Sequence, residues 1–121
     1  MTEYVVAEEG ELADGEHLVV QLEGREIGVF FTDGVYRAYL NWCPHQGGPV
    51  CEGRVTGTQT SCFDRETLDV AVKWDREGEI LNCPWHGWEF DVNSGECLSR
   101  PKVKLPEYPV RVEDGTIIVD L

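Results

Sequence analysis

Two short stretches of the chain each place a cysteine and a histidine within one turn of backbone. Residues 43–53 read "CPHQGGPVCEG", and residues 83–90 read "CPWHGWEF". Both are rich in glycine and proline, which predicts loops rather than strands. Thiolate and imidazole together are typical ligands of zinc, copper and iron–sulfur centres. The candidate metal ligands are therefore Cys43, His45, Cys83 and His86.

The sequence around these loops is patterned as short β-strands. Segments 4–9, 17–24, 26–34 and 35–41 are rich in β-branched and aromatic residues. Asp33–Gly34 and Asp114–Gly115 are dipeptides preferred in two-residue hairpin turns. No segment shows the sustained apolar period of a helix. We therefore predict an all-β fold, a small antiparallel sandwich or partly open barrel, that carries the two Cys/His stretches as loops.

The length of 121 residues suits a single domain. The tract from 54 to 82 is less regular, and we expect two strands in it, around residues 70–74 and 79–81. The chain carries no repeat and no low-complexity linker that indicates a second domain.

The charge balance excludes some partners. With 23 acidic residues against 10 basic ones, the formal net charge is −13, which disfavours nucleic acid and anionic membranes. No apolar run approaches the roughly 20 residues of a membrane span, and no signal-peptide pattern is present, so we expect a cytoplasmic protein. The acids are spread along the chain, which favours a surface suited to high salt over an acidic docking face for a basic redox partner.

The spacing of the candidate ligands separates kinds of metal site. Five cysteines without a secretion signal argue against a disulfide framework. The one-residue gap between Cys43 and His45 is awkward for structural zinc, whose chelating pairs are usually about two to four residues apart. A 2Fe–2S cluster with two cysteines on one iron and two histidines on the other has no such difficulty. A coincidental buried pair, or a catalytic thiol with its base, explains one stretch and leaves the other unexplained.

In these contexts the motifs C-x-H and C-x-x-H resemble those of the Rieske 2Fe–2S proteins. The glycine pair 47–48, the "FD…SGE" turn, "SRPKVKLPEYPVRV" and the ending "VEDGTIIVDL" resemble the same family. The resemblance extends over residues 4–121 and implies one Rieske 2Fe–2S cluster. It implies that Cys43 and Cys83 bind the buried iron, while His45 and His86 bind the outer iron near a solvent-exposed tip. It also implies a single Rieske domain over residues 1–121. The gap between the ligand pairs is longer than is usual in the family, so we expect an insertion at about 55–76 that forms an extra hairpin.

Residues near the ligands distinguish the subclasses of this family. The membrane-anchored high-potential proteins carry an extra cysteine in each cluster loop, and the matching positions here are Gly48 or its neighbour in the first loop and Trp85 in the second. Those proteins also place hydroxyl groups at positions that match Trp88 and Phe90. Because neither residue supplies a hydroxyl to the cluster, we expect a potential toward the lower end of the roughly −150 to +300 mV Rieske range.

The oxygenase subunits of the family need a further iron held by two histidines and a carboxylate. This chain has three histidines, and a cluster takes two, so His17 alone cannot complete that site. The expectation is a soluble Rieske-type ferredoxin, not itself an enzyme, that passes electrons from a reductase to an oxygenase or another acceptor. The ferredoxin-like subunit of assimilatory nitrite reductases lacks the four ligands. A zinc-stabilised interaction module without redox activity and a tightly bound small subunit of an oxygenase complex stay open as alternatives.

The remaining candidates have plain interpretations. We expect His17 to be an ordinary surface or strand-edge residue. The three cysteines outside the ligand set are expected to be free, partly buried thiols, and a Cys51–Cys62 bond is a minor alternative. The three tryptophans beside the ligands are expected either to pack in the core or to form a hydrophobic shell that limits water near the cluster. The cysteines are Cys51, Cys62 and Cys97, and the tryptophans are Trp42, Trp85 and Trp88.

Overall fold

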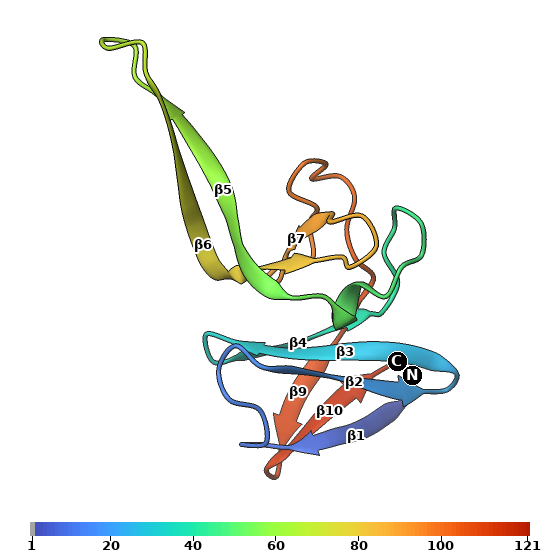
Figure 1. The fold of residues 1–121 in the computed structure, drawn as a ribbon. Helices are drawn as coiled ribbons and strands as arrows, with labels where there is room; N and C mark the ends of the chain where they lie inside the picture. The colour runs from blue at the N-terminus through green and yellow to red at the C-terminus, as the bar shows by residue number, and fades with distance from the viewer. Residues whose placement is uncertain (1) are drawn as a thin grey trace.

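The computed structural model describes residues 2–121, with only the backbone of Cys62. Nearly all of its regular structure is β-strand, as the sequence predicts (Figure 1). In chain order the elements are β1 (Glu3–Glu8), β2 (His17–Leu22), β3 (Arg25–Thr32), β4 (Val35–Leu40), the 3-10 turn η1 (Val50–Glu52), β5 (Val55–Phe63), β6 (Val70–Asn82), β7 (Glu89–Asp91), β8 (Glu107–Tyr108), β9 (Val110–Glu113) and β10 (Thr116–Asp120).

The strands of residues 2–121 form three antiparallel sheets. Sheet A has the order β1-β10-β9, sheet B has the order β2-β3-β4-β8, and sheet C has the order β5-β6-β7. Sheets A and B stack face to face as a sandwich, and sheet C lies on the other side of sheet B (Figure 1). The prediction of a small antiparallel sandwich is confirmed.

Sheet B lies between sheets A and C, and residues on both faces of its strand β3 are therefore buried. On one face, Ile27 and Val29 of β3 pack with Ile117 and Val119 of sheet A. On the other face, Phe30 packs into a second core beneath the two Cys/His loops. A strand buried on both faces shows a continuous apolar run instead of alternation, and this explains the sequence "IGVFF" in β3.

The second core fixes the two loops to the sandwich. The Tyr39 hydroxyl of β4 donates a buried hydrogen bond to the Val92 carbonyl oxygen, 2.8 Å away. Gly28 lets β3 approach η1 closely, since a Cβ atom at this position would lie 2.5 Å from the Cys51 sulfur. The loops therefore start from a closely packed base.

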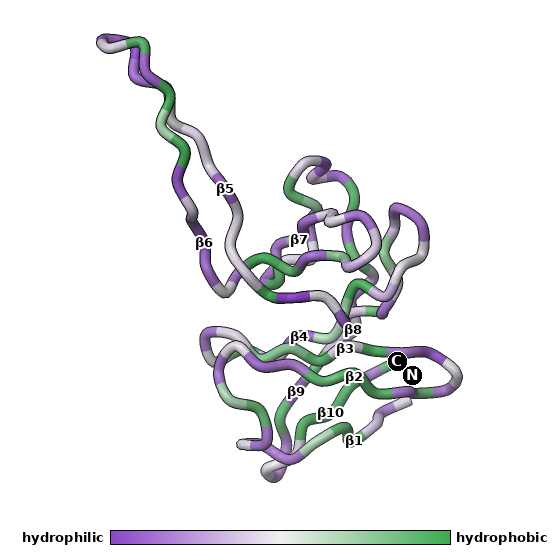
Figure 2. The backbone as a smooth tube through the Cα atoms, viewed as in Figure 1, coloured by the Kyte–Doolittle hydropathy of each residue, from purple (hydrophilic) through white to green (hydrophobic). Residues whose placement is uncertain are grey.

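Strands β5 and β6 form a long hairpin, paired from Val55↔Leu81 to Phe63↔Val70. Its far part, residues 58–75, projects beyond the rest of the molecule as a two-stranded ribbon, which we call the arm (Figure 1). Hydrophobic residues lie along the arm as well as in the body, as the colouring of Figure 2 shows.

The prediction of two strands in this tract was wrong in one respect. The expected strands around 70–74 and 79–81 are parts of one strand, β6. The intervening "DREGE" has the composition of a turn, which is why the sequence predicts a break in the strand here. Arg76 and Gly78 adopt positive φ angles of 57° and 85°, but the chain does not reverse its direction at these residues. These angles, with the register shift between Thr56 and Thr58 of β5, let the pairing continue through an irregularity.

Within residues 2–121, the structure contains no helix with the length and hydropathy needed to cross a membrane.

Candidate metal centre

The two Cys/His loops have the same backbone hydrogen bonds. In each, the cysteine N–H donates to the carbonyl oxygen five residues ahead, and a glycine N–H four residues ahead donates back to the cysteine carbonyl oxygen. Both glycines have positive φ, 76° at Gly47 and 72° at Gly87, which side chains disfavour. The four bonds are Cys43 to Gly48 (2.8 Å), Gly47 to Cys43 (2.7 Å), Cys83 to Trp88 (2.9 Å) and Gly87 to Cys83 (2.9 Å).

The cysteine side chains lie at the base of the loops. Cys43 and Cys83 are 1% and 3% exposed and belong to the second core. Burial raises the pKa of the Cys43 thiol, and the neighbouring Cys83 thiol raises it further. The two sulfur atoms therefore form an inner pair of soft donors shielded from water.

The histidine side chains lie at the solvent side of the same loops. His45 and His86 are both exposed, and their rings meet edge to face with centroids 4.9 Å apart. The structure thus places the four predicted ligands as two pairs, a buried thiol pair and an exposed imidazole pair. Among residues 2–121, no three or more His, Cys, Asp or Glu side chains gather in one group that could hold a metal ion.

This donor set fits a binuclear cluster with mixed ligands. A Rieske 2Fe–2S cluster takes two cysteines on one iron and two histidines on the other. Paired buried thiols and paired exposed imidazoles supply that set in the required two-and-two grouping.

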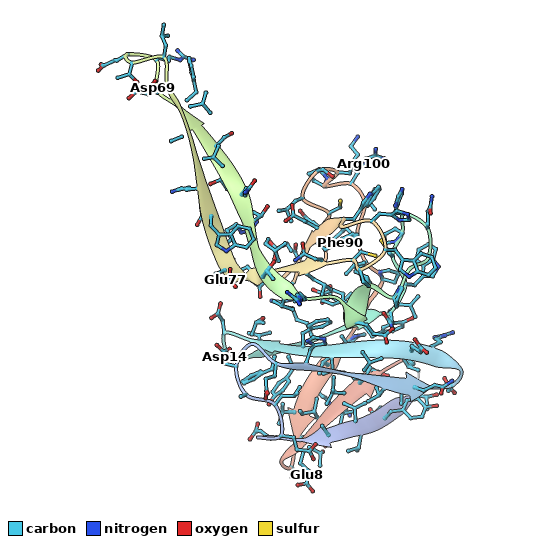
Figure 3. All side chains as sticks on the ribbon, in the orientation of Figure 1. Glu8, Asp14, Asp69, Glu77, Phe90 and Arg100 are labelled. Atoms are coloured by element: carbon cyan, nitrogen blue, oxygen red, sulfur yellow. The ribbon has the colours of Figure 1, made fainter. Side chains whose placement is uncertain are left out.

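Trp88 and Arg100 lie beside the imidazole pair. The Trp88 indole is stacked on the His45 ring, with centroids 4.2 Å apart and an interplanar angle of 13°. The guanidinium carbon of Arg100 lies 5.1 Å from the centre of the Trp88 ring, a cation–π contact. Figure 3 shows Arg100 at the outer side of the part of the molecule that carries the two loops, and Phe90 deeper within that part.

Arg100 was not among the residues predicted from the sequence. The available signal was its position directly before Pro101, in a segment that resembles a loop of the Rieske family. It is also one of only 10 basic residues in the chain.

The other two tryptophans pack on glycines of the first loop. A Cβ atom at Gly48 would lie 2.8 Å from the Trp85 ring, and one at Gly47 would lie 2.9 Å from the Trp42 ring nitrogen. Trp85 therefore links the second loop to the first. Both rings stay largely in solvent, with Trp42 46% and Trp85 57% exposed, so only Trp88 of the three packs against the second core.

The remaining cysteines and His17 lie apart from the four candidate ligands. Cys51 and Cys97 are fully buried free thiols, more buried than predicted, and burial raises the pKa of Cys51 to about 12. The side chain of Cys62 lies outside the described part of the chain. His17 begins the edge strand β2, as predicted, where its half-buried ring stacks on Phe30 and burial lowers its pKa.

Known proteins resemble this chain along nearly its whole length. The sequence profile of the Rieske 2Fe-2S domain matches residues 2–64, and that of a Rieske-like 2Fe-2S domain matches residues 64–120. The ferredoxin component of the alkene monooxygenase system of Xanthobacter autotrophicus is 29% identical, over 97% of this chain and 80% of that protein. The ferredoxin component of the naphthalene 1,2-dioxygenase system of Pseudomonas aeruginosa is 27% identical, over 92% of this chain and 88% of that protein. The solved ferredoxin of carbazole 1,9a-dioxygenase from Nocardioides aromaticivorans IC177 has a TM-score of 0.68 at 25% identity, covering 98% of this chain and 97% of that one.

Proposed function

The chain belongs to the Rieske 2Fe-2S family, and from this premise we propose that it is a ferredoxin that carries one electron at a time between redox proteins. The observation that carries the proposal is the sorting of the four candidate ligands into a buried thiol pair and an exposed imidazole pair. Bound between the loops, a 2Fe–2S cluster accepts and releases a single electron. The protein itself is a carrier and not the oxygenase, as its relatives are the ferredoxin components of oxygenase systems.

We assign the ligands by their burial. Cys43 and Cys83 hold the inner iron, and His45 and His86 hold the outer one. Burial raises the pKa of the Cys43 thiol, and a bound iron would require its thiolate form. The exposed histidines mark the end of the molecule where a partner can approach for electron exchange.

Trp88 and Phe90 set the range of the reduction potential. Phe90 is fully buried and Trp88 is half-buried, and neither side chain has a hydroxyl to donate to a sulfide or to a ligand sulfur. Hydrogen bonds to sulfur stabilise the reduced state, so their absence from these two positions places the potential toward the lower end of the roughly −150 to +300 mV Rieske range.

The partners that we propose are a reductase as electron donor and an oxygenase or another redox protein as acceptor. The matched relatives from Xanthobacter autotrophicus and Pseudomonas aeruginosa are ferredoxin components of a monooxygenase and a dioxygenase system. Their similarity extends over more than nine tenths of this chain, which supports the same kind of role here.

The setting that we propose is a cytoplasm of high salt concentration. The net charge of −13 and the spread of acidic residues along the chain support this setting. We also propose that the chain is one Rieske domain with an insertion at about 55–76, which lies within the β5–β6 hairpin.

The spectrum of the purified protein tests the function. We expect the visible and EPR spectra of a Rieske centre, with acid-labile sulfide and iron in equal amounts. His86→Ala removes a proposed ligand and abolishes this spectrum, whereas His17→Ala, which alters a histidine away from the loops, leaves it intact. A colourless protein that contains zinc and no labile sulfide contradicts the proposal.

A further inference from the structure

The arm exposes large apolar side chains on one face. In the ladder from Thr58↔Asp75 to Phe63↔Val70, directly paired residues place their side chains on the same side of the ribbon, and successive residues alternate. One face therefore carries Phe63, Val70, Val72 and Trp74. These side chains are between 56% and 64% exposed, and Leu68 in the turn at the tip is 72% exposed.

This face carries no ionisable group, although the chain as a whole is strongly acidic. The two other residues on the face are Gln59 and Ser61, and charged residues lie around it, in the turn at residues 64–69 and on the opposite face at Lys73 and Asp75. An apolar patch with a polar rim is typical of an interaction surface. Figure 3 shows the arm between Asp69 at its tip and Glu77 near its base, away from the loops that carry the candidate ligands.

The arm has no cover within the described chain. Strand β7 pairs only with residues 80–82 of β6, so the ribbon from 58 to 75 has two free edges and no third strand. An isolated two-stranded ribbon is at best marginally stable in water, and a packed face is what stabilises it. Trp74 is suited to burial, because its indole N–H already donates to the Glu77 carboxylate.

We propose that this face packs against the same face of a second copy of the chain, forming a two-fold dimer through the arms. Two such ribbons stack as the two sheets of a sandwich do, with their apolar side chains interdigitated. The patch is self-complementary, as a two-fold contact requires, since its apolar side chains and the uncharged Gln59 and Ser61 meet the same residues of the second copy without placing like charges together.

The exposed apolar area of the arm is large enough for a contact with a second copy of the chain. From the exposed fractions of the four apolar side chains on the face and of Leu68 at the tip, each copy offers roughly 500 Å² of apolar surface, and full coverage of both copies reaches the roughly 1,000 Å² at which specific interfaces begin. Charge agrees as well. Two molecules of net charge −13 repel one another, and the uncharged face is where they approach at least cost.

Salt gives this dimer a distinguishing property. Screening weakens the repulsion between the two acidic molecules and leaves the apolar contact in place, so association strengthens as salt rises. A contact with a basic partner protein through the acidic surface has the opposite dependence.

Sedimentation equilibrium of the cluster-loaded full chain tests the proposal. We expect a monomer–dimer equilibrium that shifts toward dimer as KCl rises from about 0.1 M to about 2 M. Val72→Glu places a charge within the apolar face and weakens dimerisation at least about tenfold. The matched control Ala71→Glu adds the same charge to the neighbouring exposed position on the opposite face, and it leaves the dimerisation constant nearly unchanged.

Val72→Thr keeps the β-branched shape and makes the face polar, so it weakens the dimer even if the glutamate variant loses its arm. The visible spectrum of each variant shows whether the cluster site is intact. A monomer at every salt concentration overturns the proposal, whether or not the arm binds a redox partner. Equal losses in Val72→Glu and Ala71→Glu overturn it too, because net charge alone then accounts for the effect.

Discussion

Trp88 connects a proposed ligand to a positive charge. Its ring is stacked on His45, and the Arg100 guanidinium lies over the same ring, 5.1 Å from its centre. A stacked indole restricts the orientation of the imidazole, much as outer contacts fix metal-binding histidines elsewhere. Arg100 adds a permanent positive charge near the exposed histidine pair, where we propose that the electron leaves.

Replacing Arg100 tests its electrostatic role. The reduced cluster carries one more negative charge than the oxidised one, so a nearby cation stabilises the reduced form. We expect Arg100→Gln to lower the reduction potential by on the order of tens of millivolts, because the exposed charge is partly screened by solvent. Voltammetry of the cluster-loaded protein measures this shift.

Lys102→Gln is the matched control for Arg100→Gln. It removes the same charge from an exposed residue in the same segment, and only Arg100 has a described cation–π contact with Trp88. We expect a clearly smaller shift in potential. Equal shifts in the two variants contradict a specific role for the Arg100–Trp88 contact.

At the residue scale, the sequence predicted the four candidate ligands but not every residue that lies near them. Cys43, His45, Cys83 and His86 were identifiable because their residue types and spacing match a known donor set. Arg100 was not, because its contact with Trp88 depends on how residues 97–103 fold back over the second loop. Contacts of that kind join segments with no local pattern in common.

At the element scale, the elements that were predicted correctly are those closed by local turns. Asp33–Gly34 and Asp114–Gly115 both adopt positive φ at each residue, as a two-residue hairpin turn requires, and they close β3–β4 and β9–β10. Strand β6 was divided in the prediction because "DREGE" has turn composition, whereas pairing with β5 on both sides of the irregular residues 76–79 joins the two parts into one strand. Pairing partners distant in sequence overrode local preference there.

Replacing Tyr39 measures how strongly the second core beneath the two Cys/His loops is attached to sheet B. Its buried hydroxyl donates to the Val92 carbonyl oxygen, and Tyr39→Phe leaves that buried carbonyl without this donor. We expect a loss of about 1–3 kcal/mol in the free energy of unfolding. Chemical denaturation followed by far-UV circular dichroism measures the loss.

Tyr36→Phe provides the comparison for Tyr39→Phe. Tyr36 is a half-buried residue of the same strand, stacked on Phe31, and no hydrogen bond of its hydroxyl is described. This variant is expected to change stability by less than about 0.5 kcal/mol. If both variants lose the same stability, the hydrogen bond from the Tyr39 hydroxyl to the Val92 carbonyl oxygen contributes little.

At the scale of the whole molecule, acidic groups greatly outnumber their possible partners. Within residues 2–121, the ion pairs involve three arginines, each with one or two carboxylates. The chain has 23 acidic residues, so most carboxylates face solvent without a described cation. The three arginines are Arg37, Arg76 and Arg111.

This imbalance predicts that the stability of the folded state depends on salt. Folding brings the carboxylates closer together, and their repulsion destabilises the compact form at low ionic strength. We expect the midpoint of thermal unfolding to rise as KCl increases from about 0.1 M to about 2 M, where the screening length falls from about 10 Å to below 3 Å. Sucrose, which is uncharged, serves as the control for general exclusion of solute from the protein surface.

Dimerisation also stabilises the folded state by mass action, so the salt effect on folding is best measured without it. Val72→Glu is the background for this measurement, since its dimerisation is expected to be at least about tenfold weaker, and it is measured at a protein concentration where sedimentation shows a monomer. A rise in the midpoint for this variant, larger with KCl than with sucrose, assigns the dependence to the charge of the single chain. A midpoint that is unchanged by KCl in the variant contradicts adaptation of the fold to high salt. If it rises only in the wild type, the dependence belongs to the contact between the arms.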